Sequence, residues 1–414
     1  MVKVIRNVTL IDGTDVAPVK GATVVIEDEK ITAAGPSGQV EAPAGAGVEA
    51  VDGGGLTLLP GLIDAHIHIT GTGDPNILKA IRKTVPYVTL ESAVNARKTL
   101  EAGFTTIRDA GGEWLVDISL RDAIRDGLVP GPRMLVSGMG LSITGGHGDH
   151  FFPPEVEFKG RYVVDSPDEA RKAAREQLRS GADLIKLMAT GGVMSEKDLP
   201  TARGMTVAEM EAAIEEAHNA GKKTLAHAQG ANGIRNAILA GIDSIEHGFY
   251  LTDEIIDLML ERGVFLVPTL VAVHQIIVNG EKAGIPEYGV RKAKEHAEAH
   301  RKSFQKALKA GVKIAMGTDA ATPFNFHGHN ALELQLMVEA GMTPSQALQA
   351  ATRMGAELLG LSDKVGTVEP GKLADLVLVD GDPLADIKLL QDKERIKLVV
   401  KGGQTAVDRR GGKP

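Results

Sequence analysis

The middle of the chain repeats one structural unit. Each copy has a short apolar segment, a loop rich in Gly or Asp, an amphipathic stretch and a glycine before the next apolar segment. The apolar segments that fit this unit, each predicted to be a strand, are Leu59–His68, Phe104–Asp109, Arg133–Ser137, Leu184–Met188, Lys223–Ala228, Ser244–His247, Val264–Leu270 and Lys313–Thr318. Eight parallel strands joined by helices predict an α/β fold, a TIM-type (β/α)8 barrel formed by residues 58–360.

The ends of the helices between these strands are marked in the sequence. Ser166, Thr206 and Thr343 each precede a Glu or Gln by three residues, the spacing of a capping box at a helix N-terminus. The predicted helix stops, where a left-handed terminal residue is needed, are Gly103, Gly181, Gly221, Gly241, Gly263, Gly311 and Gly341.

Both ends of the chain have a different, β-rich character. Residues 1–57 alternate apolar and polar positions, with a charged turn at Glu27–Lys30, and Ala374–Val379 and Ile396–Val400 are also β-rich. Short isolated sheets are only marginally stable. We therefore expect 1–57 and 361–414 to pair into a small discontinuous β-sandwich domain beside the barrel.

Composition limits the possible partners. The 46 basic and 54 acidic residues give a net charge of -8 without a basic tract, which favours a small-molecule substrate and argues against nucleic acid. The start of the chain resembles a strand more than a signal peptide, and the apolar run Val264–Val273 contains Pro268 and is too short to span a bilayer. We expect no membrane partner and a cytoplasmic location.

Six candidate metal ligands lie at the ends of predicted strands. The chain has no cysteine, so a metal ion needs His, carboxylate or modified Lys ligands. The candidates are His66, His68, Lys186, His227, His247 and Asp319. Residues two apart in a strand face the same side, so His66 and His68 both point into the barrel. Asp64 shares their parity and is either a partner of these histidines or a structural carboxylate.

Lys186 is unusual because it interrupts an apolar strand, where an unpaired ammonium is costly to bury. One solution is a carbamate, formed from the amine and carbon dioxide, whose two oxygens can bridge two metal ions. The alternative is a lysine that snorkels or pairs with a carboxylate. The histidines nearby in the predicted fold favour the carbamate.

The remaining ligands complete a hydrolytic site. His227 and His247 can hold a second ion, although either could instead be a core histidine. Asp319 can bind metal and act as general base and then general acid, although it could instead cap a helix. Two cations would lower the pKa of a shared water from 15.7 towards ~7, which predicts hydrolysis.

These residues resemble those of the metal-dependent amidohydrolase superfamily, in its binuclear class with a carboxylated lysine. The resemblance covers nearly the whole chain, including Leu59–His68 and Pro370–Leu376. The stretches Ala189–Met194, Ala226–Gly230 and Ser244–Gly248 are most similar to the Xaa-Pro dipeptidase (prolidase) and imidazolonepropionase-like branch.

The resemblance implies two divalent ions, with zinc expected. His66, His68 and Asp319 would bind one, His227 and His247 the other, and carboxylated Lys186 would bridge them. It also implies hydrolysis of an amide bond in dipeptides or N-acyl amino acids, and a homo-oligomer. The alternatives at the same site are a carbamate, phenylurea, ochratoxin-type amide, lactone or phosphotriester substrate. A non-catalytic scaffold protein is the third class, and the presence of all six ligands argues against it.

Several residues are candidates for substrate binding. The glycine-rich loop Leu141–Tyr162, which holds His147, His150, Phe151 and Phe152, is predicted to act as a mobile lid, with His147 polarising the substrate carbonyl. Mononuclear deaminases and true imidazolonepropionases on this fold usually carry a glutamate soon after the histidine at the fifth strand, whereas this chain has Ala228-Gln229-Gly230, which disfavours both activities. Gln229 occupies a site where some related peptidases carry an aromatic residue. Other candidates on strand-end loops are Arg203, Tyr250, His327 and His329.

Overall fold

The computed structural model describes residues 1–76, 79, 81–149, 155 and 162–411. Two sheets with parallel neighbouring strands form the middle of the chain. The first has the order β6 (Leu62–Ile67), β7 (Phe104–Asp109) and β8 (Arg133–Val136). The second has the order β10 (Tyr162–Val163), β9 (Leu141–Ser142), β11 (Leu184–Met188), β12 (Lys223–Ala228), β13 (Ser244–His247) and β14 (Phe265–Val267).

Residues 313–320 connect the two sheets at one side. The Ala315 amide donates to Leu266 O of β14 (3.0 Å), and the Ala65 amide of β6 donates to Met316 O (2.9 Å). The predicted strand Lys313–Thr318 therefore lies where it was expected, but it forms isolated bridges and no continuous strand. The reason is its change of partner from β14 to β6 within a few residues.

At the other side, β8 lies next to the residue that precedes β11. The Asp183 amide donates to Val136 O (2.7 Å), and the Val136 amide donates back to the Asp183 carboxylate (3.2 Å). The two parallel sheets are thus linked at two places, through residues 313–320 between β14 and β6 and through Asp183 between β8 and β11.

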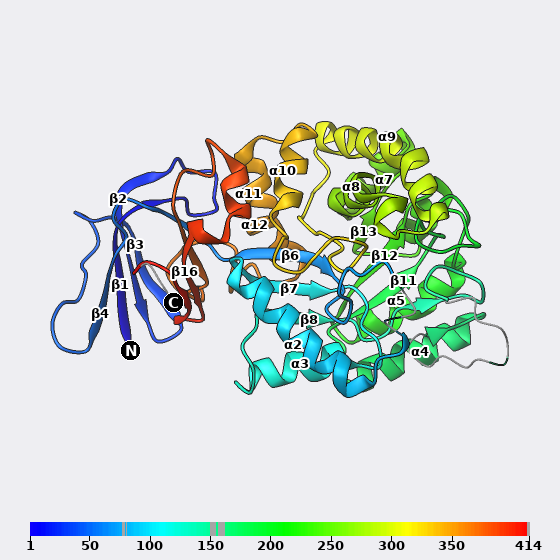
Figure 1. Ribbon diagram of the computed structural model, residues 1–414, viewed down its shortest axis with the longest axis horizontal. Coiled ribbons are helices and arrows are strands. Elements are labelled where there is room, and N and C mark those ends of the chain that lie inside the picture. The colour runs from blue at the N-terminus through cyan, green and yellow to red at the C-terminus, as the bar shows by residue number, and fades with distance from the viewer. Residues whose placement is uncertain (77–78, 80, 150–154, 156–161, 412–414) are drawn as a thin grey trace.

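Helices follow the strands around these sheets (Figure 1). They are α2 (Val85–Glu101), α3 (Val116–Arg125), α4 (Pro167–Arg179), α5 (Val207–Asn219), α6 (Ala231–Leu239), α7 (Asp253–Arg262), α8 (Leu270–Asn279), α9 (Glu287–Ala310), α10 (Leu332–Glu339), α11 (Pro344–Ala350) and α12 (Arg353–Leu358). Among the helices that the structure describes, none is long and apolar enough to cross a membrane.

The predicted helix boundaries are largely confirmed. Thr206 and Thr343 form complete capping boxes at α5 and α11. Ser166 caps α4 by accepting from the Glu169 amide, but the Glu169 carboxylate accepts from the Asp165 amide (2.7 Å) in place of the Ser166 amide. All seven glycines predicted to stop helices have positive φ.

The predicted strand Leu59–His68 is split in two. Its first part belongs to β5 (Thr57–Pro60) and its second to β6, with Gly61 between them. A Cβ atom at Gly61 would lie 2.1 Å from Thr105 Oγ1, so only glycine allows this close approach. The chain passes here from the sheet of the chain ends into the parallel sheets.

The chain ends share one eight-stranded sheet, which lies at one end of the molecule with both termini (Figure 1). Its order is β17 (Gln404–Asp408), β16 (Ile396–Lys401), β15 (Leu376–Val379), β5, β1 (Val2–Leu10), β2 (Val19–Glu27) and β3 (Lys30–Pro36), with β4 (Val48–Asp52) also paired to β1. Side chains from both chain ends pack in one apolar cluster, for example Val24 with Leu376 and Leu398. The expected pairing of the two ends is therefore observed, while the sandwich arrangement and the domain boundaries stay predictions.

Alternation along the strands decides which side chains face the site. In β11, Ile185 and Leu187 pack in the large core shared with the helices, whereas Leu184 belongs to a small separate cluster with Ala110 and Leu225. Lys186 has the parity of Leu184 and therefore lies on the inner side.

Candidate metal centre

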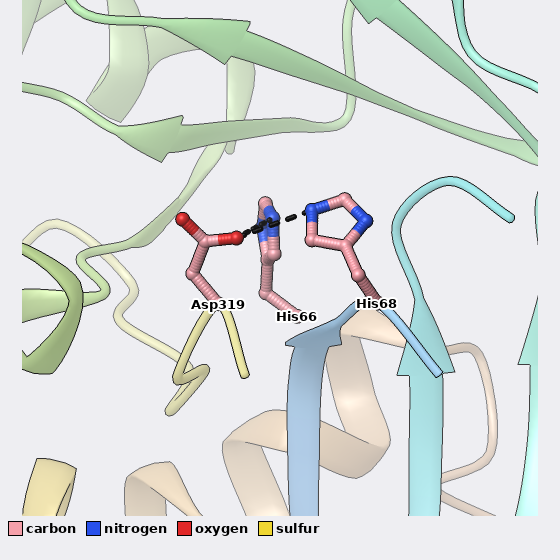
Figure 2. Close-up of side chains that lie close together, drawn as sticks. All are labelled: His66, His68 and Asp319. Carbon is pink, nitrogen blue, oxygen red and sulfur yellow. Dashed lines mark ion pairs between the residues drawn. The ribbon is translucent and has the colours of Figure 1, made fainter. Parts of the chain in front are cut away.

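His66, His68 and Asp319 converge on one point at the ends of their segments. One ligand atom from each lies within 4.8 Å of the other two, and Figure 2 shows the carboxylate and both rings pointing toward one another. Asp319 Oδ1 is 3.1 Å from His68 Nε2 and 3.5 Å from His66 Nε2. His66 Nε2 is buried and makes no hydrogen bond within the described structure, so it fits a metal ligand.

The backbone and charge of Asp319 suit this role. Its φ of 59° is left-handed, and its amide donates to His66 O (2.7 Å), which fixes the residue beside β6. Burial alone would raise the pKa of Asp319, but the close contacts with His66 and His68 hold that pKa well below its usual value. The side chain is therefore an anionic ligand at neutral pH.

Asp64 has a structural role. Its carboxylate accepts from the Thr318 amide (3.1 Å) and hydroxyl (2.7 Å) and from the Asn330 side chain (2.7 Å). It also accepts from the His66 amide (3.1 Å), not from the ring. These bonds connect β6 to the segment that carries Asp319. Of the two roles that the sequence left open for Asp64, the structure therefore favours the structural carboxylate over a partner of the histidine rings.

The sequence analysis missed a buried ion pair behind His66. The Nδ1–H group of His66 donates to Glu246 Oε2 (2.6 Å), and Arg108 Nη2 donates to both oxygens of Glu246 (2.9 and 3.0 Å). Burial raises the pKa of Glu246, but the Arg108 charge and the His66 hydrogen bond outweigh it and lower that pKa to about 2. The signal in the sequence was two opposite charges inside apolar strands, Arg108 in β7 and Glu246 in β13.

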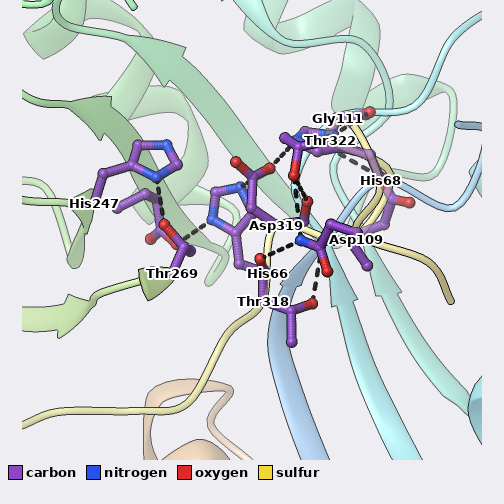
Figure 3. Close-up of polar contacts among 12 residues, drawn as sticks. His66, His68, Asp109, Gly111, His247, Thr269, Thr318, Asp319 and Thr322 are labelled. Atoms are coloured by element: carbon purple, nitrogen blue, oxygen red, sulfur yellow. Dashed lines mark hydrogen bonds and ion pairs between the residues drawn. The ribbon is translucent and has the colours of Figure 1, made fainter. Parts of the chain in front are cut away.

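This ion pair fixes the tautomer of His66. A carboxylate can only accept, so Nδ1 carries the proton and Nε2 presents its lone pair to the site. His68 is oriented in the same way, because its Nδ1 donates to Gly111 O (2.9 Å), as Figure 3 shows.

We predict that Glu246→Gln weakens metal binding by about 10–100-fold, because the amide is a poorer acceptor for His66 Nδ1–H and leaves Arg108 unpaired. Competition with a chromophoric chelator measures this affinity. Glu209→Gln is the matched control, since Glu209 is also buried but serves the capping box of α5, and its metal affinity should equal that of the wild type. Equal affinity in both variants would contradict the role of Glu246.

Lys186, His227 and His247 lie on the neighbouring strands β11, β12 and β13, with Lys186 in the middle of its strand and both histidines near the ends of theirs. The parallel register places Met188 beside His227 and Ala228 beside His247. The rings of His227 and His247 are 4.6 Å apart between centroids, and that of His247 is 5.2 Å from that of His66. Lys186 is 1% exposed and lines the same cavity.

Both histidines of this second group are neutral. Burial lowers the pKa of each well below its usual value. His227 Nε2 donates to Gly191 O (2.9 Å), which leaves Nδ1 as the nitrogen that can accept, and His247 Nδ1 contacts Thr269 Oγ1 (2.7 Å; Figure 3). Among the His, Asp and Glu side chains that the structure describes, a three-residue ligand group forms at His66, His68 and Asp319, and His227 and His247 lie next to it.

These residues surround a cavity of about 360 Å³. Its polar lining includes His147 and Gln229 in addition to the metal-ligand candidates. Its apolar wall is formed by Met188, Val193, Met194, Phe249, Val273, Ile276 and Pro286. The cavity is therefore large enough for a small molecule and offers an apolar surface beside a polar centre.

His147 lies where the sequence analysis placed it, at the candidate site. Its ring stacks on that of His227 with 4.1 Å between centroids, and its Nδ1 contacts Ser195 Oγ (2.6 Å). His150, Phe151 and Phe152 of the predicted lid lie outside the described residues.

The other predicted substrate-binding residues lie apart from the described lining of the cavity. Arg203 is exposed and forms a bridge with Thr190. The Tyr250 hydroxyl contacts His296 Nδ1 (2.6 Å). His327 is buried and donates to Gly71 O (3.1 Å), while His329 is exposed. Their roles in substrate binding stay predictions.

Comparison with known proteins identifies the family. A family model described as the amidohydrolase family matches residues 57–406. The Aspergillus niger ochratoxinase is 36% identical over 367 residues, which cover 84% of this chain and 75% of that protein. The Geobacillus kaustophilus imidazolonepropionase is 28% identical over 422 residues, covering 95% of this chain and 92% of its own.

Solved structures give the same result. A Xaa-Pro dipeptidase, solved with methionine bound in its active site, aligns with a TM-score of 0.90 at 34% identity and covers 98% of this chain and 99% of that one. The chain belongs to the amidohydrolase family and is a hydrolase. The resemblance expected from the sequence is confirmed, and these neighbours imply a TIM barrel with an additional domain.

Proposed function

We propose that the protein is a binuclear metal-dependent hydrolase that cleaves an amide bond in dipeptides or N-acyl amino acids. The observation that carries the proposal is one cavity lined by the His66, His68 and Asp319 group together with two neutral histidines and a buried lysine. The parallel strands and the segment 313–320 would close into the eight-stranded barrel, with these ligands at its C-terminal mouth.

Two divalent ions, zinc in our proposal, would occupy this cavity. His66, His68 and Asp319 would hold one, and His227 and His247 the other. The Lys186 amine would add to carbon dioxide and lose one proton, giving a carbamate that bridges the two. Such ions supply Lewis-acid catalysis and activate water near neutral pH.

The side chains of the chain itself move and hold the protons. Asp319, held as a carboxylate by His66 and His68, takes the proton of the attacking water and delivers it to the leaving nitrogen. His147, oriented by Ser195 and by stacking on His227, donates a hydrogen bond to the substrate carbonyl oxygen.

An amino acid fits as the leaving group. The Xaa-Pro dipeptidase that aligns over 98% of this chain was solved with methionine in its active site. The wall of Val193, Met194, Phe249 and Ile276 suits an apolar side chain such as that of methionine.

We expect protein purified without chelator to contain about two divalent ions per chain, and chelation to remove its activity with recovery on adding zinc. Elemental analysis and the hydrolysis of dipeptides, N-acyl amino acids, aryl carbamates and phenylureas test this. Less than one ion per chain would contradict the binuclear proposal. A preference for carbamates or phenylureas over every amide would contradict the substrate proposal.

The domain boundaries, with 1–57 and 361–414 beside a catalytic domain of residues 58–360, remain part of this proposal. So do a homo-oligomeric state and a cytoplasmic location.

A further inference from the structure

Gln229 is a buried residue that lines the cavity of the candidate site. It follows the end of β12, two residues after the ligand candidate His227, and is 4% exposed. Its backbone N–H group donates to Thr190 Oγ1 (2.9 Å), and its backbone carbonyl oxygen accepts from the Tyr250 amide (3.1 Å). Both backbone groups are therefore satisfied by the protein, and the backbone of Gln229 is held in place from both sides.

The side chain of Gln229 is not satisfied in the same way. Its Oε1 atom is buried and has no hydrogen-bond partner among the described residues, although the residue lines the cavity. A buried amide oxygen without a donor is unfavourable, and native proteins rarely keep one without a reason. A ligand that brings a donor to this point would remove the penalty.

The position of Gln229 indicates which part of a ligand supplies the donor. Gln229 comes two residues after His227 at the end of β12, and both residues line the same cavity, which puts Gln229 on the side of the proposed metal centre. The lining of this cavity also includes the apolar side chains of Val193, Met194 and Ile276.

We infer that Gln229 is a specificity-determining residue whose Oε1 accepts a hydrogen bond from the N–H of the scissile amide. The inference rests on the proposed amide hydrolysis and refines its substrate class. Secondary amides, which carry this N–H, are the preferred substrates. Tertiary amides, including Xaa–Pro bonds, lack the donor and leave the Gln229 oxygen unpaired. The chain would thus differ in specificity from the neighbours named for prolidase activity.

A cycle that combines one change in the substrate with one in the enzyme tests the inference. The substrates are N-acetyl-L-methionine and N-acetyl-N-methyl-L-methionine, and the enzymes are the zinc-loaded wild type and Gln229→Met, which keeps the side-chain length without the amide. For the wild type, N-methylation should lower kcat/KM by about 10–100-fold. For Gln229→Met, the kcat/KM values of the two substrates should agree within about threefold, because the variant has no side-chain oxygen that the N-methylated substrate would leave unpaired.

The ratio separates specificity from general damage. A variant that is merely less stable loses activity on both substrates and keeps the wild-type ratio, which would overturn the inference. Gln229→Leu provides a second measurement if Gln229→Met does not fold. A wild type that cleaves both substrates equally well would also overturn it. If the wild type cleaves no amide of either kind, the proposed function fails first, and this result is distinct from an unchanged ratio.

Discussion

Asp319→Asn is expected to lower kcat by about 10²–10⁴-fold, the usual contribution of a general base and acid. The substitution keeps the size of the side chain and an oxygen that can face His66 and His68, but it removes the negative charge that accepts a proton. KM should change far less than kcat, because Asp319 acts on the attacking water and the leaving nitrogen more than on substrate binding. Steady-state kinetics with the metal content measured on the same sample gives both quantities.

Asp183→Asn is the matched control for this prediction. Asp183 lies at the start of β11, at the opposite end of the parallel strands, where it pairs with Arg121 (2.6 Å). Its loss should affect stability and leave kcat within about twofold, since that face of such folds serves stability. Wild-type kcat in metal-loaded Asp319→Asn would show that the proton is transferred by another group.

The parts of the site that lie on regular strands could be predicted from the sequence. The alternation His66-x-His68 and the position of Lys186 inside an apolar strand depend only on a period of two, and the structure keeps both. His227 and His247 follow from the same argument, because the parallel register sets their strands side by side. Patterns of this kind depend only on the local geometry of a strand, so they can be predicted without knowing the tertiary structure.

The interactions that depend on tertiary packing could not be predicted. Arg108 and Glu246 belong to strands far apart in the sequence, and their pairing behind His66 becomes visible only when the strands are placed together. The segment 313–320 looks like an ordinary strand, yet it changes partner midway. A Cβ at Gly317 would lie 2.4 Å from Val267 Cγ1, a crowding that the sequence does not reveal.

Residues on loops were the least predictable. Tyr250 and Arg203 follow strand ends, as substrate-binding residues often do, but their loops carry them to His296 and Thr190. Loop conformation depends on contacts made at a distance, so the end of a strand fixes only the first one or two residues beyond it. Gln229 is the first residue after β12, and it lines the cavity as the sequence predicted.

Lys186→Ala is expected to remove activity, with a loss in kcat/KM of at least about 10³-fold, because the substitution deletes the bridging carbamate and the site then holds its ions poorly. The loss should be partly reversed by millimolar acetate or propionate, whose carboxylate can occupy the space left by the side chain and replace the carbamate oxygens. Rescue by a neutral amide of the same size is not expected, because the bridging ligand must be anionic.

Lys292→Ala separates this role from the effect of deleting any buried lysine. Lys292 is also 1% exposed, but it extends from α9 and donates to backbone oxygens of the loop after β11, including Ser195 O and Gly192 O. Its removal should loosen that loop and lower activity without any response to short carboxylates. Rescue of Lys186→Ala alone would support a bridging anion at this position. Full activity of Lys186→Ala, or equal rescue of both variants, would contradict a bridging carbamate at Lys186, and the binuclear mechanism would have to be abandoned.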